Sequence, residues 1–198
     1  MTKRMVAAGA VLVASLALAA GCGNGSDTGG GGGGDAGGPS CDAYCTTVTK
    51  NCAGATAVYV SKEVCLAACK HLPVGTTADT TGNTLGCRAY HAGAAASNAV
   101  LHCPHAGPGG AGYCGSNCEG YCNLAQGVCS TFQTEKDCLD ICKTFTDEEA
   151  TKPFSAQDVS GNTLQCRLYH SSVAAADKMH CAHIGTTPTP GTCTDATP

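Results

Sequence analysis

The chain has 198 residues, seventeen of them cysteine, and its formal net charge at pH 7 is −4. Only 13% of the residues are charged, and the eleven Lys and Arg form no basic stripe, which argues against nucleic acid as a partner. Its most acidic run, at residues 147–149, is expected to be a solvated loop. So many cysteines in a short chain are typical of proteins that form disulfide bonds outside the cytoplasm.

The N-terminal segment has the pattern of a secretory signal. Lys3 and Arg4 precede an apolar stretch that ends in the sequence LAAGC at residues 18–22. Small residues before a cleavage point mark such a signal, and LAAGC resembles a bacterial lipobox, in which the cysteine thiol is acylated. We therefore expect a lipoprotein signal peptide in residues 1–21 and a lipid on Cys22. Ordinary signal cleavage, which leaves Cys22 as a free thiol, is the alternative.

Residues 22–40 are expected to form the lipidated cysteine and a flexible linker. The segment is dominated by glycine, with small polar residues and one proline, and chains of this composition behave as flexible coils. The lipid would attach the rest of the protein to a membrane. Gly23 and Asn24 follow the cysteine without an early Asp. This pattern predicts a bacterial cell envelope protein, held at the outer membrane or the cell surface.

A tandem duplication begins at Cys41. The sequence DTTGNTLGCRAYH at residues 79–91 returns as DVSGNTLQCRLYH at residues 158–170. Each block is followed by a second short motif of the form H-C-x-H, and each copy contains eight cysteines. Because a repeat of this kind marks a structural unit, we define module 1 as residues 41–114 and module 2 as residues 118–193. Eight cysteines are an even set, which predicts four disulfide bonds in each module.

Each module is expected to contain three helices. The first covers residues 42–51 and 119–128, the second begins at the N-caps Ser61 and Thr134, and the third runs from residues 83 and 162 through alanine-rich segments. The chain has no Trp and only three Phe. A module of about 75 residues with so few large side chains depends on cross-links for its stability. We therefore expect an all-α, disulfide-rich fold after the signal peptide and the linker.

Two C-x3-C pairs in each module predict part of the disulfide pattern. A spacing of four residues places both sulfurs on one face of a helix, so two antiparallel helices can be joined by two bonds. The expected bonds are Cys41–Cys69, Cys45–Cys65, Cys118–Cys142 and Cys122–Cys138. The other four cysteines of each module leave three connectivities open. Zinc clusters and thiol-redox sites are not expected, because both favour C-x2-C spacing.

The repeated C-R-x-Y-H block with its H-C-x-H motif resembles uncharacterised cysteine-rich lipoproteins of myxobacteria and their relatives. The resemblance covers residues 41–193 and is most specific at the two motifs. It implies an envelope location and supplies no activity.

Six of the seven histidines occupy matching positions in the two modules: His91, His102, His105, His170, His180 and His183. Neutral imidazole is a common metal ligand, and three of them with an open fourth position suit Zn or Cu. If Cys87 bonded to Cys103, the three histidines of module 1 would come together. The alternative interpretation is architectural, with the rings capping helices, stacking on tyrosines and binding backbone carbonyls.

Arg88 and Tyr90, with their counterparts Arg167 and Tyr169, are also duplicated. Arg and Tyr are frequent binding anchors, which makes these four residues candidates for a binding surface. The structural alternative is a buried tyrosine against an arginine that forms an ion pair with a nearby acid. The candidate acids are Asp79 and Asp158.

No catalytic signature is found in the chain, neither a nucleophile motif, a metalloprotease motif nor a phosphate-binding loop. The sequence therefore predicts a non-enzymatic envelope lipoprotein with no cofactor other than Zn or Cu. Its two modules would bind another envelope protein or a glycan, or have a structural role. The first alternative is a periplasmic or surface metal-binding protein with three histidines per module. The second alternative is a small hydrolase, which only the histidines support.

Overall fold

A computed structural model describes residues 38–188 and 192–195 of the chain. These described residues all belong to one compact unit. The expected signal peptide, Cys22 and most of the linker lie outside the described residues. Within the described ranges the regular structure is helical, and extended pairing is limited to an isolated bridge between Thr146 and Thr163. The expectation of an all-α fold is confirmed.

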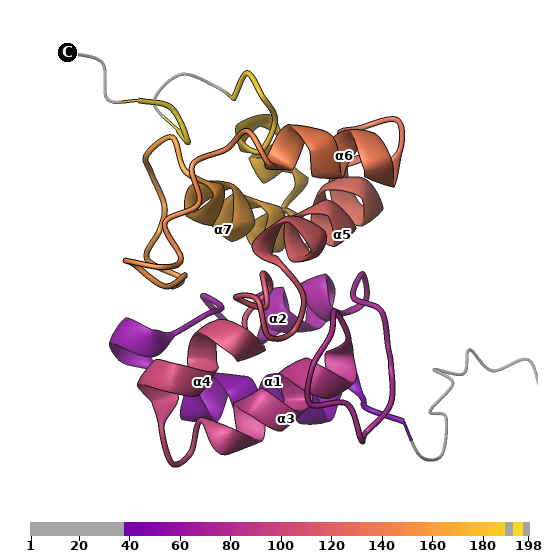
Figure 1. Ribbon diagram of the computed structural model, residues 1–198, viewed down its shortest axis with the longest axis vertical. Coiled ribbons are helices and arrows are strands. Elements are labelled where there is room, and N and C mark those ends of the chain that lie inside the picture. The colour runs from indigo at the N-terminus through magenta and orange to yellow at the C-terminus, as the bar shows by residue number, and fades with distance from the viewer. Residues whose placement is uncertain (1–37, 189–191, 196–198) are drawn as a thin grey trace, which may run out of the picture. The chain divides into compact units, whose positions relative to one another are not determined.

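Figure 1 shows that α1–α4 lie together in the first half of the unit and α5–α7 in the second. The helices of module 1 are α1 (Cys41–Asn51), the 3-10 helix η1 (Gly54–Thr56), α2 (Lys62–Cys69), α3 (Leu85–Ala94) and α4 (Ala99–Ala106). Those of module 2 are α5 (Asn117–Cys129), α6 (Glu135–Cys142), α7 (Leu164–Ala174) and the 3-10 helix η2 (Lys178–His183). In each module the first helix packs against the second and the third.

The second helix of each module starts at the N-cap that the sequence predicts, and the first helices start one and two residues earlier than expected, at Cys41 and Asn117. The side chain of Ser61 accepts a hydrogen bond from the Val64 backbone N–H, and Thr134 accepts one from Asp137. Such caps satisfy backbone donors that have no partner inside the helix. A full capping box, in which Ser116 and Glu119 bond reciprocally, starts α5. Module 2 therefore begins directly after module 1.

The prediction of a long third helix is wrong in both modules. The helix α3 ends at Ala94, and α4 begins after Asn98, whose side chain accepts from the Leu101 N–H. In module 2, α7 ends at Ala174, and the side chain of Asp177 caps η2. Asn and Asp compete with helix continuation by bonding nearby backbone groups. Within the described residues, module 1 therefore contains four α-helices and the 3-10 helix η1, and module 2 contains three α-helices and the 3-10 helix η2.

Eight disulfide bonds join the sixteen cysteines of the described residues. Four of them are the bonds that the C-x3-C spacing predicts, Cys41–Cys69, Cys45–Cys65, Cys118–Cys142 and Cys122–Cys138. The connectivity that the sequence left open is Cys52–Cys103 with Cys87–Cys114, and Cys129–Cys181 with Cys166–Cys193. The bridge between Cys87 and Cys103, which was considered for the histidine site, does not form. All sixteen sulfurs are used in the same pattern in both modules.

Each module has a small core around its first helix, made of half-cystines and aliphatic or tyrosine side chains. The fully buried side chains include Tyr44, Val48, Tyr121, Leu124 and Leu168. The modules also contact each other, because α2 packs against α7 and the Ala156 N–H donates to the Ala57 carbonyl at 2.6 Å. No helix of residues 38–188 and 192–195 is both long and apolar enough to cross a bilayer.

Candidate metal centres

The central histidine of each module lies on the third helix and is held by a backbone carbonyl. His91 on α3 is 4% exposed, and its Nε2 lies 3.3 Å from the Thr80 carbonyl oxygen. His170 on α7 is 5% exposed, and its Nε2 lies 3.1 Å from the Val159 carbonyl oxygen. A carbonyl can only accept a hydrogen bond, so Nε2 of each neutral ring carries the proton. The Nδ1 atom of each central histidine therefore presents a lone pair.

The other histidine nitrogens converge on this lone pair in both modules. Nδ1 of His91 lies 3.0 Å from Nδ1 of His102. In module 2, Nδ1 of His170 lies 2.7 Å from that of His180 and 3.2 Å from that of His183. Within each triplet, one ligand nitrogen per residue lies within 4.8 Å of the others. The structure therefore brings together all six histidines that the sequence singled out.

The distances of 3.0 Å and 3.2 Å are those of ligands around one ion, and the distance of 2.7 Å between His170 and His180 is slightly shorter. Metal–nitrogen bonds of about 2.0–2.1 Å place neighbouring ligand nitrogens about 2.9–3.4 Å apart. One lone pair on His170 can accept one hydrogen bond, yet two other Nδ1 atoms lie within 3.2 Å of it. A central cation satisfies all three lone pairs at once. In module 1, Nδ1 of His105 is buried and has no hydrogen-bond partner among the described residues.

The surroundings of His91, His105, His170 and His183 favour the neutral form of their rings. Burial, together with the smaller effect of the neighbouring histidines, lowers the pKa of His105 and of His170 to about 4. Burial also lowers the pKa of His91 and of His183. Neutral imidazole is the form that binds a metal. Among the described residues, no carboxylate oxygen lies within 4.8 Å of all the ligand nitrogens of either triplet. The expected ligand set in each module is therefore three imidazole nitrogens without a carboxylate.

Two duplicated side chains hold the backbone that follows the third histidine. The Tyr44 hydroxyl donates to the Ala106 carbonyl, and the Tyr121 hydroxyl donates to the Ile184 carbonyl. Both tyrosines are buried on the first helix of their module. Neither tyrosine was predicted as part of the site, although the pattern C-x2-Y-C at residues 41–45 and 118–122 is a signal for both. Such supporting contacts orient metal ligands and fix their distance from one another.

The duplicated arginines also hold the backbone that follows the third histidine. They do not form the ion pairs that the structural alternative proposed. Arg88 is fully buried and donates to the carbonyls of Thr84, Gly107 and Pro108 at 3.1–3.2 Å. Arg167 donates to the carbonyls of Thr163 and Gly185 and to the Asn162 side chain. Each arginine thus ties the third helix to the segment after the last histidine.

The two candidate acids have other partners. Asp79 accepts hydrogen bonds from the Thr76 and Thr84 hydroxyls, and Asp158 pairs with Lys152 at 2.5 Å.

Tyr90 and Tyr169, expected as partners of the arginines, lie against the central histidines instead. The Tyr90 ring meets His91 edge-on at 5.1 Å between centroids, and Tyr169 meets His170 at 4.9 Å. Tyr90 is 51% exposed, so it is not the buried tyrosine that the structural alternative required. The four duplicated residues therefore do not form one binding surface, because the arginines point inward and Tyr90 points to solvent.

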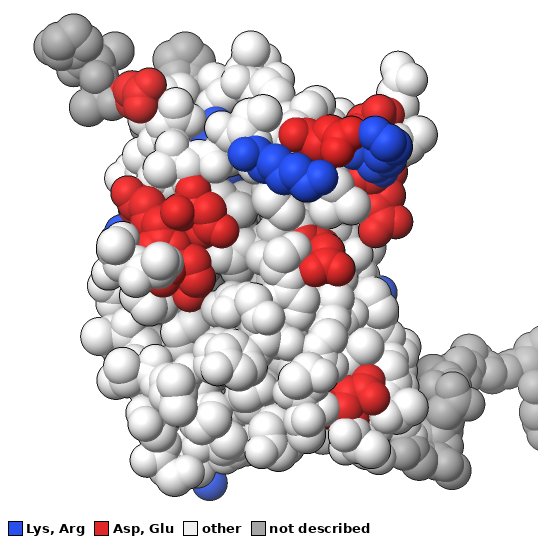
Figure 2. Space-filling model, viewed as in Figure 1, with Lys and Arg blue, Asp and Glu red and all other residues white. Residues whose placement is uncertain are grey.

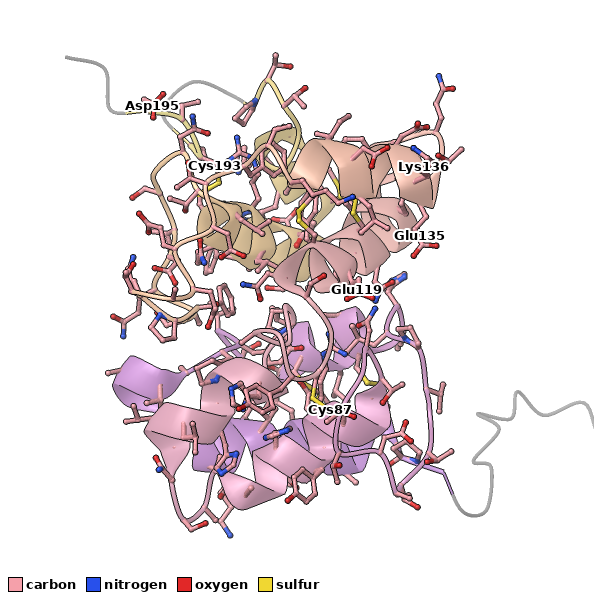
Figure 3. All side chains as sticks on the ribbon, viewed as in Figure 1. Cys87, Glu119, Glu135, Lys136, Cys193 and Asp195 are labelled. Atoms are coloured by element: carbon pink, nitrogen blue, oxygen red, sulfur yellow. A yellow bond between two sulfur atoms is a disulfide. The ribbon has the colours of Figure 1, made fainter. Side chains whose placement is uncertain are left out.

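Two disulfide bonds of each module border the histidines. Cys103 and Cys181 stand next to His102 and His180 in the chain and bond to the ends of α1 and α5. The bonds Cys87–Cys114 and Cys166–Cys193 lie beside the central histidines, and Figure 3 labels Cys87 and Cys193. Because their sulfurs are oxidised, they supply no thiolate ligand.

The acidic run is only partly the solvated loop that the sequence predicts. Figure 2 shows acidic side chains gathered over the loop between α6 and α7. Asp147 is exposed, whereas Glu149 is half-buried, and burial raises its pKa. Both carboxylates accept hydrogen bonds from the buried Asn117 side chain at the start of module 2. The run thus helps to seat the loop against α5.

Residues 40–118 match the family model described as BfoA family C-terminal domain. This stretch contains module 1 and the first residues of α5. A protein of Aspergillus niger, Aurasperone B biosynthesis cluster protein A, is 37% identical over 71 residues, which are 35% of this chain and 23% of that protein. The match thus takes in about a quarter of the relative's length. No solved structure matches the chain.

The family match spans module 1 as the cysteine pattern delimits it. The resemblance to cysteine-rich bacterial lipoproteins stays a prediction.

Proposed function

We propose that the protein binds transition-metal ions, one in each module. The ligands are His91, His102 and His105 in module 1, and His170, His180 and His183 in module 2. The observation that carries the proposal is the convergence of histidine nitrogens on one point in both modules. Two sequences that differ at most other positions form the same arrangement. Among the interpretations of the sequence, metal binding is the one that this geometry supports best.

The surroundings support binding by a rigid site. Backbone carbonyls orient the central histidines, and tyrosine, arginine and disulfide contacts hold the segment that carries the other two. A site whose ligands are held in place loses little entropy when the ion binds. Three imidazoles without a carboxylate suit Zn or Cu.

Metal content per chain tests the proposal. We expect the oxidised protein, loaded with Zn²⁺ or Cu²⁺ and then desalted, to retain two ions per chain by elemental mass spectrometry. The variants His102→Ala and His180→Ala should each retain one ion, and the double variant none. Both side chains are half-buried, so their loss should leave the fold intact.

His71 provides the matched control, because it is the one histidine without a counterpart in the other module. His71→Ala should retain two ions. Two retained ions in the His102→Ala/His180→Ala variant would contradict the proposal, and so would a metal-free wild-type protein.

We further propose that a lipid on Cys22 anchors the modules to a membrane of the bacterial cell envelope, at the outer membrane or the surface. The support is the LAAGC sequence at residues 18–22 and the glycine-rich linker that follows it. More than one acyl chain gives stable anchoring. Modules anchored in this way would be able to bind an envelope protein or a glycan.

Mass spectrometry of the mature protein tests the anchor. In a bacterium that processes lipoproteins, we expect the N-terminal peptide to begin with a diacylglyceryl-modified Cys22 and the protein to fractionate with membranes. Cys22→Ser should release it into the soluble fraction. A mature N-terminal peptide with unmodified Cys22 would contradict the anchor and leave the metal sites unaffected.

A further inference from the structure

The third histidine has different surroundings in the two modules. His105 is 8% exposed, whereas His183 is half-buried and more accessible. The central histidines do not differ in this way, since His91 and His170 are 4% and 5% exposed. The two candidate sites therefore share a ligand set but differ at one ligand.

Tyr113 covers one face of His105 in module 1. Its ring stacks on His105 with 4.0 Å between centroids and 30° between planes, and it also meets His91 edge-on at 5.9 Å. His105 is thereby held between Tyr113 and His91. His105 also borders a cavity that Pro104 and Asn117 line, and 8% of its surface is exposed.

Module 2 has threonine in place of this tyrosine. The disulfide bonds Cys87–Cys114 and Cys166–Cys193 each span 27 positions, so Thr192 is the counterpart of Tyr113. Among the described residues, the aromatic rings that contact His183 are those of His170 and His180. The ring of His183 can therefore rotate away from the site without displacing an aromatic neighbour.

The turn that carries Tyr113 is firmly placed. The Tyr113 carbonyl accepts from the Gly82 N–H at 2.9 Å, and the Tyr113 N–H donates to the Gly110 carbonyl at 3.0 Å. Gly82, Gly110 and Gly112 have positive φ values of 86°, 85° and 81°, which glycine adopts without strain. Tyr113 thus meets His105 from a fixed backbone, although 55% of its own surface is exposed.

We infer that Tyr113 makes the two sites unequal, so that module 1 retains its ion and module 2 exchanges its ion with competing ligands. An ion leaves a three-histidine site after one ligand swings away. In module 1 this motion must break the stacking of His105 on Tyr113, and an aromatic pair contributes about 0.5–1.5 kcal/mol, or about 2- to 12-fold in a rate. The inference rests on the proposed metal binding and assigns the exchangeable ion to module 2.

Release rates measured in single-site proteins test the inference. His180→Ala leaves the module 1 site, and His102→Ala leaves the module 2 site. Each protein is loaded with one Zn²⁺, and an excess of a chromogenic chelator reports its release. We expect the module 2 site to release zinc about 2- to 12-fold faster. Tyr113→Thr should speed release from module 1 by a similar factor, and Thr192→Tyr should slow release from module 2.

Tyr113→Phe is the matched control, because it keeps the ring and removes only the hydroxyl, and its release rate should equal that of the parent. Equal rates at the two sites, or a Tyr113→Thr variant as slow as its parent, would overturn the inference while leaving metal binding in place. Failure of both single-site proteins to retain zinc would instead overturn the proposed function.

Discussion

Arg88→Met is expected to lower the free energy of unfolding by about 3–5 kcal/mol. The arginine is fully buried and donates to the Gly107 and Pro108 carbonyls at 3.1 Å. Methionine preserves much of the volume but leaves both carbonyls without their donor, and each unsatisfied buried group costs about 1–3 kcal/mol. Denaturation by guanidinium chloride with the disulfide bonds intact measures the loss.

Tyr90→Ala on the same helix is the control for Arg88→Met. Tyr90 is 51% exposed, so its loss should change stability by less than about 1 kcal/mol. Arg88→Met should also weaken metal retention in module 1 alone, because the segment that Arg88 holds follows His105. A stability within 1 kcal/mol of the wild type would show that the guanidinium does not hold this segment.

Removal of the Cys52–Cys103 bond is expected to destabilise the protein by about 4 kcal/mol and to abolish the module 1 metal site. The bond spans 51 positions and ties the residue after His102 to the end of α1. Loss of a cross-link increases the conformational freedom of the unfolded chain, and more so for a longer loop. Without it, α4 is free to move His102 and His105 away from His91. Thermal unfolding and retained zinc of the Cys52→Ala/Cys103→Ala variant measure both effects.

The Cys45–Cys65 bond provides the comparison. It spans 20 positions within the α1–α2 hairpin, away from the histidines. The variant Cys45→Ala/Cys65→Ala should lose about 3 kcal/mol and still retain two ions per chain. If both double variants lost the module 1 ion equally, the Cys52–Cys103 bond would have no specific role at the site.

Sequence reasoning predicted the helices best where a local signal was strong. Ser61 and Thr134 cap helices at the expected residues, and the C-x3-C spacing predicts the hairpin disulfides. It failed where two local signals competed, since the alanine-rich stretch after His91 favours helix but Asn98 stops it. Asn98 and Asp177 stand seven positions after His91 and His170. This regular position was a signal for the break.

The candidate site depended more on contacts between distant segments. The repeated positions of the histidines identified all six members. The arginines were identified too, but with the wrong partners, because acids nearby in the chain suggested ion pairs. In the structure Arg88 binds carbonyls about twenty residues away. The role of Tyr44, whose partner is 62 positions away, has no local sign except the duplicated C-x2-Y-C pattern.

By itself, the sequence determined the all-α class, the duplication, the paired cysteines of the helical hairpins and the six histidines. Helix periodicity and cysteine spacing depend only on neighbouring residues. The duplication and the six histidines are found by comparing one repeat with the other. The tertiary structure decided the remaining disulfide connectivity, the inward direction of the arginines and the meeting of the histidine nitrogens. It also distinguished the two modules, because the stacking of Tyr113 on His105 joins two side chains across a turn that only the folded backbone positions.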